Sequence, residues 1–203
     1  KQALANSCNC YFVNLALKIG KDKLYNFSKS LGFGDSFNLY DNTFPVSGAS
    51  FPTVEELKSD GQLALLGFGQ GKLTDTPVHF ASIVAAISNG GYYNLPTLNI
   101  KNSASNQVIS SKTCAVLRNY MKNVVENGTG FNAQYKSQTA GKTATAQSGI
   151  YVDGKEQLNT WFVGFYPYDN PKYSIVVMRE GGKSGAGDCC PVFRTIVEKI
   201  DNM

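Results

Sequence analysis

The stretch Ala140-Gly141-Lys142-Thr143-Ala144-Thr145-Ala146-Gln147 places one cation and two hydroxyls along a short segment of backbone. Threonine favours strands, and side chains alternate between the two faces of a strand, so Lys142 and Ala144 are predicted to share one face while the threonines take the other. A strand of this kind is suited to line a cleft. Gly-Lys-Thr also ends a phosphate-binding loop, but Lys136 stands where that loop needs its first glycine, which excludes a nucleotide site.

Two apolar runs after this stretch predict buried strands, and the polar segment Gly149 to Asn159 is predicted to be a hairpin connection. Three successive strands with short links imply an antiparallel meander. The predicted strands lie near residues 139–147, 160–166 and 173–179. A closing helix is predicted from Pro191 to Ile200, because apolar residues recur there at helical spacing. These elements predict an α+β fold.

The first 130 residues predict mainly helices. Apolar periodicity predicts one helix ending at Gly20 and another ending at Gly32, where glycine provides the usual cap. The segment from Asp35 to Asp60 has no sustained periodicity and is predicted to be loop. The cluster Gly67 to Gly71 is predicted to be a tight turn, and a strand is predicted around Leu95 to Ile100.

Two helix starts are marked by capping residues. Thr76 precedes Pro77, which suits the first helical position, and this helix is predicted to stop at Asn89-Gly90-Gly91. Ser110-Ser111 is predicted to cap the next helix. His79 falls in the first turn of the earlier helix, where a surface or packing role is favoured over a ligand role.

The composition limits the classes of protein to which this sequence can belong. The chain has 203 residues, of which 42% are hydrophobic and 17% charged, which predicts a folded domain. The net charge of +4 is mild and the lysines are scattered, so no nucleic-acid partner is predicted. The five cysteines lack the spacing of zinc ligands, and only one histidine is present, so neither a metal nor a cofactor is predicted.

The sequence contains no apolar window of about 20 residues and nothing that resembles a signal peptide. It begins with Lys1-Gln2-Ala3-Leu4-Ala5-Asn6, which resembles the interior of a helix. We therefore expect a fragment of a longer protein.

An ordered set of short motifs now supports a family resemblance. They are Ser7-Cys8-Asn9, Gly69-Gln70-Gly71 followed by Thr76-Pro77, Asn89-Gly90-Gly91, Gly128-Thr129-Gly130, Ala140-Gly141-Lys142-Thr143, and Trp161-Phe162-Val163-Gly164-Phe165-Tyr166-Pro167. Together they resemble the transpeptidase domain of class B high-molecular-weight penicillin-binding proteins, over nearly the whole chain. The resemblance implies a single, incomplete domain of the serine β-lactamase and transpeptidase fold, with a helical part at 1–130 and a sheet and C-terminal helix at 131–203.

Two departures from the family pattern matter. The family nucleophile lies in a Ser-x-x-Lys turn upstream of Ser-x-Asn, and no serine of this chain has lysine three residues later. The third motif has Ala144 where the family usually has glycine, which adds a methyl group to the cleft. We therefore expect this chain alone to be inactive.

The resemblance implies a serine-type D-Ala-D-Ala transpeptidase that cross-links peptidoglycan stem peptides by acyl transfer and is inhibited by β-lactams. Ser7 would sit between the absent lysine and Lys142 and relay a proton toward the leaving group, or act as a helix N-cap, and both roles can hold. Asn9 would contact the substrate amide carbonyl. Lys142 would attract the terminal carboxylate of the substrate, and the Thr143 and Thr145 hydroxyls would bind it. The substrate would lie antiparallel along the strand through Thr143, Ala144 and Thr145, with the Thr145 N–H in the oxyanion hole.

The family also implies partners and a location for the parent protein. The partners are stem peptides, the upstream segment with Ser-x-x-Lys, and cell-wall synthesis proteins. The location is the outer face of the bacterial cell membrane, with an N-terminal anchor. Two alternatives stay open: a β-lactam sensor or β-lactamase of the same fold, and a degenerate interaction module without catalysis.

Overall fold

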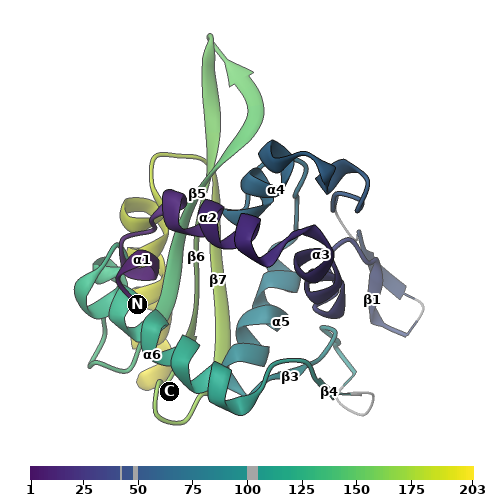
Figure 1. Cartoon of the computed structure of the whole chain (residues 1–203). Helices are drawn as coiled ribbons and strands as arrows, with labels where there is room; N and C mark the ends of the chain where they lie inside the picture. Colours follow the sequence, from purple (N-terminus) through teal and green to yellow (C-terminus); the bar gives the residue numbers. More distant parts are fainter. Residues whose placement is uncertain (42, 48–49, 100–104) are drawn as a thin grey trace.

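The computed structural model describes residues 1–41, 43–47, 50–99 and 105–203. A three-stranded antiparallel sheet lies at its centre, with helices packed around it (Figure 1). The strands are β5 (Ala140–Val152), β6 (Lys155–Tyr166) and β7 (Tyr173–Gly182), in the spatial order β5-β6-β7. The predicted α+β fold with an antiparallel meander is therefore confirmed.

The helices precede the sheet, apart from one that follows it. They are α1 (Gln2–Ala5), α2 (Asn9–Ile19), α3 (Lys21–Ser30), α4 (Asp60–Gly67), α5 (Pro77–Ser88), α6 (Ser111–Asn127) and α7 (Cys190–Asp201). Short helical turns are the 3-10 helices η1 (Glu56–Lys58) and η3 (Phe131–Ala133) and the π-helical turn η4 (Gly185–Cys189).

Alternate residues of β6 face two different helix layers, as the period of a strand requires. Phe162 packs against Phe193 of α7, with 4.7 Å between the ring centroids. Phe165 faces the other way and packs with Val84 of α5 and Met121 of α6. Both faces of the sheet are thus covered, which explains why its strands are apolar on both sides.

The predicted helix caps are confirmed. The Thr76 hydroxyl accepts a hydrogen bond from the His79 N–H at 3.3 Å, with Pro77 at the start of α5. The Ser110 hydroxyl accepts from the Thr113 N–H at 3.2 Å at the start of α6. Gly20 has φ of +82° where α2 ends, a conformation that glycine adopts without steric cost.

The prediction of loop from Asp35 to Asp60 is wrong in part. Two short strands, β1 (Phe37–Tyr40) and β2 (Thr43–Val46), pair there as an antiparallel ribbon. Only Phe37 of this ribbon is buried. Four residues per strand with one inward side chain produce too little alternation to be recognised in a sequence.

The strand predicted around Leu95 to Ile100 is also wrong where it can be checked, because residues 95–99 form no strand. Ile100 lies outside the described residues. The pairing occurs instead between β3 (Tyr92–Tyr93) and β4 (Asn106–Gln107). Pro96 cannot donate a ladder hydrogen bond, and Leu95 and Leu98 are exposed, so this segment has no sheet face to bury.

The polar connection predicted from Gly149 to Asn159 is mostly strand. β5 and β6 continue through it and turn only at Asp153-Gly154, where both residues have positive φ. Asp-Gly is a favoured pair for such two-residue turns. The resulting hairpin projects beyond the rest of the molecule in Figure 1.

Candidate active site

Ser7 and Lys142 meet in the structure although 135 positions separate them in the sequence. Ser7 lies in the link between α1 and α2, and Lys142 is the third residue of β5. The Lys142 Nζ donates a hydrogen bond to the Ser7 Oγ at 2.7 Å. In Figure 1, α2 crosses in front of β5 and α1 lies beside the strand, so the link that carries Ser7 is close to β5.

The backbone of Ser7 is held in an unusual conformation. Its φ is +52°, in the left-handed region that costs a non-glycine residue about 1 kcal/mol. The Ser7 N–H bonds to the Leu4 carbonyl at 3.2 Å, and the Cys8 N–H bonds to the Ala3 carbonyl at 2.9 Å. The helix-cap role considered for Ser7 is wrong, because Cys8 occupies the N-cap of α2 and Ser7 lies one residue too early.

Lys142 is partly buried at the base of the site. Besides Ser7, its ammonium group contacts the Thr143 carbonyl at 2.6 Å. Burial lowers the pKa of Lys142 from 10.5 to about 8. The side chain is therefore mostly charged at neutral pH, yet it can give up its proton more readily than an ordinary lysine.

The other predicted site residues are sequence neighbours of Ser7 or Lys142, but their side chains do not take part in the contact between those two residues. Asn9 is the first residue of α2 and is exposed to solvent. Ala144 is exposed on the same face of β5 as Lys142, as strand alternation predicts. Thr145 accepts a hydrogen bond from the Gly185 N–H at 3.4 Å.

Thr143 has a partner that its sequence neighbourhood does not reveal. Its buried hydroxyl lies 2.6 Å from the Thr129 hydroxyl, in the turn after α6. The Thr129 N–H also donates to the Ala5 carbonyl at 3.0 Å, two residues before Ser7. The motif Gly128-Thr129-Gly130 was noted in the sequence, but spacing alone gives no sign that this turn joins α1 to β5.

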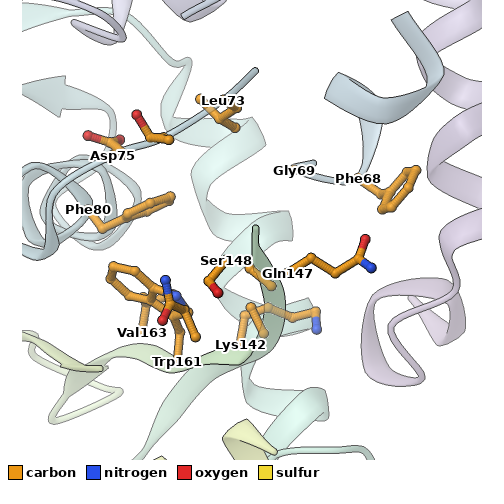
Figure 2. Close-up of a pocket in the computed structure, with 14 residues that line it drawn as sticks. Phe68, Gly69, Leu73, Asp75, Phe80, Lys142, Gln147, Ser148, Trp161 and Val163 are labelled. Carbon is orange, nitrogen blue, oxygen red and sulfur yellow. The ribbon is translucent and has the colours of Figure 1, made fainter. Parts of the chain in front are cut away.

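A cavity of about 370 Å³ opens beside Lys142. In Figure 2 the side chains of Lys142, Trp161 and Val163 come from the sheet, and Phe80 faces them from α5. The Phe80 and Trp161 rings lie 5.7 Å apart, which makes this wall apolar. The complete lining is Phe68, Gly69, Leu73, Thr74, Asp75, Phe80, Lys142, Ala144, Ala146, Gln147, Ser148, Asn159, Trp161 and Val163.

The cysteines do not define a second site. All five are free thiols; Cys8 and Cys10 are exposed, and Cys114, Cys189 and Cys190 are buried. Within the described ranges, no three histidine, cysteine or acidic side chains come together in a group that could hold a metal ion.

The fold and the Ser7–Lys142 contact can now be compared with known proteins. The model of the penicillin-binding protein transpeptidase domain family matches residues 1–198, so the chain belongs to that family.

Individual relatives of the chain are consistent with this family assignment. The chain is 32% identical over 200 residues to stage V sporulation protein D of Bacillus subtilis, covering 90% of this chain and 30% of that protein. It is 28% identical over 234 residues to the peptidoglycan D,D-transpeptidase MrdA of Haemophilus influenzae, covering 97% of this chain and 35% of that protein. The chain therefore spans about a third of the length of these relatives.

Solved structures show the same fold. The D,D-transpeptidase domain of a peptidoglycan glycosyltransferase from Eggerthella lenta matches with a TM-score of 0.80 and 26% identity, covering 99% of this chain and 52% of that chain. Pseudomonas aeruginosa PBP2 in complex with WCK 5153 matches with a TM-score of 0.80 and 27% identity, covering 97% of this chain and 46% of that chain. In the part of the chain that is described, no helix is both long and apolar enough to cross a membrane.

Proposed function

We propose that the chain is the C-terminal part of a D,D-transpeptidase domain that cross-links peptidoglycan stem peptides by serine acyl transfer. The observation that carries this proposal is the 2.7 Å contact between the Lys142 ammonium and the Ser7 hydroxyl at the edge of the cavity. A lysine with a lowered pKa beside a serine is suited to proton transfer in covalent catalysis without histidine.

In this proposal the nucleophile is a serine supplied by a Ser-x-x-Lys segment of the longer protein. Its oxygen attacks the carbonyl carbon of the penultimate D-alanine, and the terminal D-alanine leaves with a proton. An amine of a second stem peptide then attacks the ester and releases the serine. Ser7 relays the proton to the leaving group, and Lys142 stabilises the charge near Ser7.

The strand β5 binds the substrate in this proposal. Thr143, Ala144 and Thr145 lie along it, and an extended stem peptide adds beside it as a further strand. The Thr145 N–H is one of two oxyanion donors, and loss of one such donor typically costs about 3 to 4 kcal/mol of barrier. Lys142 attracts the terminal carboxylate, and the exposed Asn9 amide contacts the substrate carbonyl.

The cavity supports the need for an upstream segment. It lies between the Lys142 face of β5 and α5, its wall at Phe80 and Trp161 is apolar, and its volume is about 370 Å³. An apolar space of this kind is suited to a helical turn that presents a serine toward Lys142. The chain by itself has no Ser-x-x-Lys, so we expect it to be inactive without that segment.

We further propose that the parent protein is membrane-anchored and works outside the cytoplasmic membrane, together with other proteins of cell-wall synthesis. This follows from the family and the proposed substrate, which lies on that side of the membrane. The relatives named above include peptidoglycan transpeptidases, which supports the proposal.

The test is the intact mass of two proteins after incubation with excess benzylpenicillin: this chain, and the same chain extended upstream in its parent sequence. We expect the extended protein to gain one drug mass on the serine of Ser-x-x-Lys and the short chain to gain none. A control is the extended protein with that serine changed to alanine, which should stay unmodified.

Other outcomes separate the alternatives. Acylation followed by rapid drug hydrolysis would indicate a β-lactamase, and stable acylation without peptide cross-linking would indicate a sensor. An extended protein that never reacts would favour the degenerate module. The exposed Ala144 methyl is the feature that favours that module, because it occupies a position where the family usually has glycine.

A further inference from the structure

His79 is buried in the first turn of α5, where both of its ring nitrogens are in short contact with acceptors. Its side chain is 4% exposed. Nδ1 lies 2.7 Å from the Asp75 Oδ2, and Nε2 lies 2.7 Å from the Leu31 carbonyl oxygen. The Tyr93 hydroxyl is also 3.1 Å from Nε2.

This geometry favours the charged form of the ring. A carboxylate and a backbone carbonyl can only accept hydrogen bonds, so both ring nitrogens must donate. A neutral imidazole has one N–H, whereas an imidazolium has two. The contacts to Asp75 and Leu31 are thus those that an imidazolium satisfies, and the Asp75 carboxylate is itself almost fully buried, at 5% side-chain exposure.

The charged and titratable groups around His79 come from three segments. Asp75 precedes α5, Tyr93 belongs to β3, and Asp35 follows α3 and pairs with Lys29 at 2.5 Å. Burial opposes the charged ring, but the hydrogen bond and charge of Asp75 outweigh it and raise the pKa of His79 above 6.5. Burial raises the pKa of Tyr93 to about 12, so its hydroxyl keeps its proton at neutral pH.

The pair also adjoins the cavity described above. Asp75 lines the cavity, and its Oδ1 accepts a hydrogen bond from the Thr76 N–H at 2.7 Å. On the other side of the imidazole, the Phe33 ring meets it edge-on at 5.2 Å and meets Phe80 at 6.3 Å. Phe80 in turn contacts Trp161 across the cavity wall.

We propose that His79 is a positioning residue of this cavity, whose imidazolium holds the wall formed by Asp75, Phe80 and Trp161 and whose loss of a proton releases it. Without that proton, either the Asp75 Oδ2 or the Leu31 carbonyl oxygen loses its imidazole donor while buried, and an unsatisfied buried group costs about 1 to 3 kcal/mol. When His79 loses its proton, the segment that carries Asp75 moves, and the unsatisfied buried oxygen becomes accessible to water.

The direction in which this stabilisation changes with pH follows from the raised pKa of His79. The stabilisation is complete below the unfolded pKa, about 6.5, and disappears as the pH rises through the higher folded value. The cavity wall is thus expected to be ordered at neutral to mildly acidic pH and to loosen as the solution becomes more alkaline.

The composition makes this testable, because the chain has one histidine and one tryptophan. The imidazole C–H signal of His79 is followed by NMR, and the emission of Trp161 by fluorescence, across the same pH series with the full chain. We expect one common midpoint above 6.5. In Asp75→Asn the His79 midpoint should fall, and the Trp161 midpoint should fall with it.

Lys142 requires a control because it lines the same cavity and its pKa is about 8. In Lys142→Met, the emission change coupled to His79 should persist; in His79→Gln it should be lost. Trp161 emission that stays constant through the His79 midpoint would overturn the proposal. A step that survives His79→Gln when Lys142→Met is also present would overturn it as well. If His79→Gln does not fold, the wild-type and Asp75→Asn midpoints still decide. No drug or upstream segment is involved, so this test is independent of the proposed enzymatic function.

Discussion

At the scale of single residues, two energetically unfavourable features occur at the same place. Ser7 has a left-handed backbone, and Lys142 has an ammonium group partly removed from water. Neither feature stabilises the fold by itself, since backbone strain and the burial of charge are both unfavourable. Their coincidence at one 2.7 Å contact is typical of a site whose geometry serves chemistry.

Lys142 gives a prediction on stability. Because burial depresses its pKa to about 8, the folded chain binds this proton less tightly than the unfolded chain does. The charged form therefore destabilises the fold below pH 8, and this penalty fades as the pH rises from about 8 toward 10.5. Lys142→Met should raise the free energy of unfolding at pH 7 by about 1 kcal/mol, a value reduced for partial solvent exposure.

Urea denaturation at pH 7 and pH 10 tests this prediction, with the exposed Lys155→Met as the matched control. The advantage of Lys142→Met should shrink at pH 10, and the control should show little effect at either pH. A loss of stability at pH 7 would mean that the bonds to Ser7 and Thr143 outweigh burial.

At the scale of elements, β5 depends on the turn η4 that packs behind it. A Cβ built on Gly185 would lie 2.3 Å from the Trp161 carbonyl oxygen and 2.8 Å from the Ala144 carbonyl oxygen. These neighbours are backbone atoms of the sheet and cannot move aside as a flexible side chain would. The close approach therefore requires glycine at this position.

Gly185→Ala should destabilise the chain by about 2 to 3 kcal/mol, because the methyl group must displace η4 or the strands. Gly61→Ala is the matched control: Gly61 lies in the first turn of α4, and its nearest neighbour would be 3.9 Å away. That change should stabilise the chain by about 0.5 to 1 kcal/mol. Thermal unfolding of both variants distinguishes them, and equal effects would contradict the packing described for η4.

The elements also show what the sequence can and cannot predict. α5, α6 and α7 were predictable because each has an apolar face, and α5 and α6 also have capping residues. The β1–β2 ribbon was not, because four-residue strands with one buried side chain carry almost no pattern. Asp153-Gly154 was a usable turn signal, but the polar residues beside it hid the extension of β5 and β6.

The residues of the candidate site also divide into those that the sequence predicts and those that only the structure reveals. The faces of Lys142 and Ala144 follow from strand alternation, and the importance of Ser7 and Asn9 came from the family resemblance. The Thr129–Thr143 hydrogen bond and the wall at Asp75 and Phe80 join segments far apart in the chain. Local sequence holds no information on such contacts, so only the structure reveals them.

At the scale of the whole molecule, the sheet provides two kinds of surface. One face is sealed by α7 through the Phe162–Phe193 contact. The other packs against α5 and α6 along part of its length and leaves the cavity open beside Lys142. The helical part and the sheet thus meet at the candidate site.

Peptide cross-linking is measured on the chain extended upstream to include Ser-x-x-Lys. The extended protein is incubated with a stem peptide ending in D-Ala-D-Ala and a stem peptide with a free acceptor amine, and the products are separated by mass. We predict one free D-alanine for each cross-linked product, with both abolished by Lys142→Met and by benzylpenicillin. Hydrolysis of benzylpenicillin with no cross-linked peptide would show that the protein is not a transpeptidase.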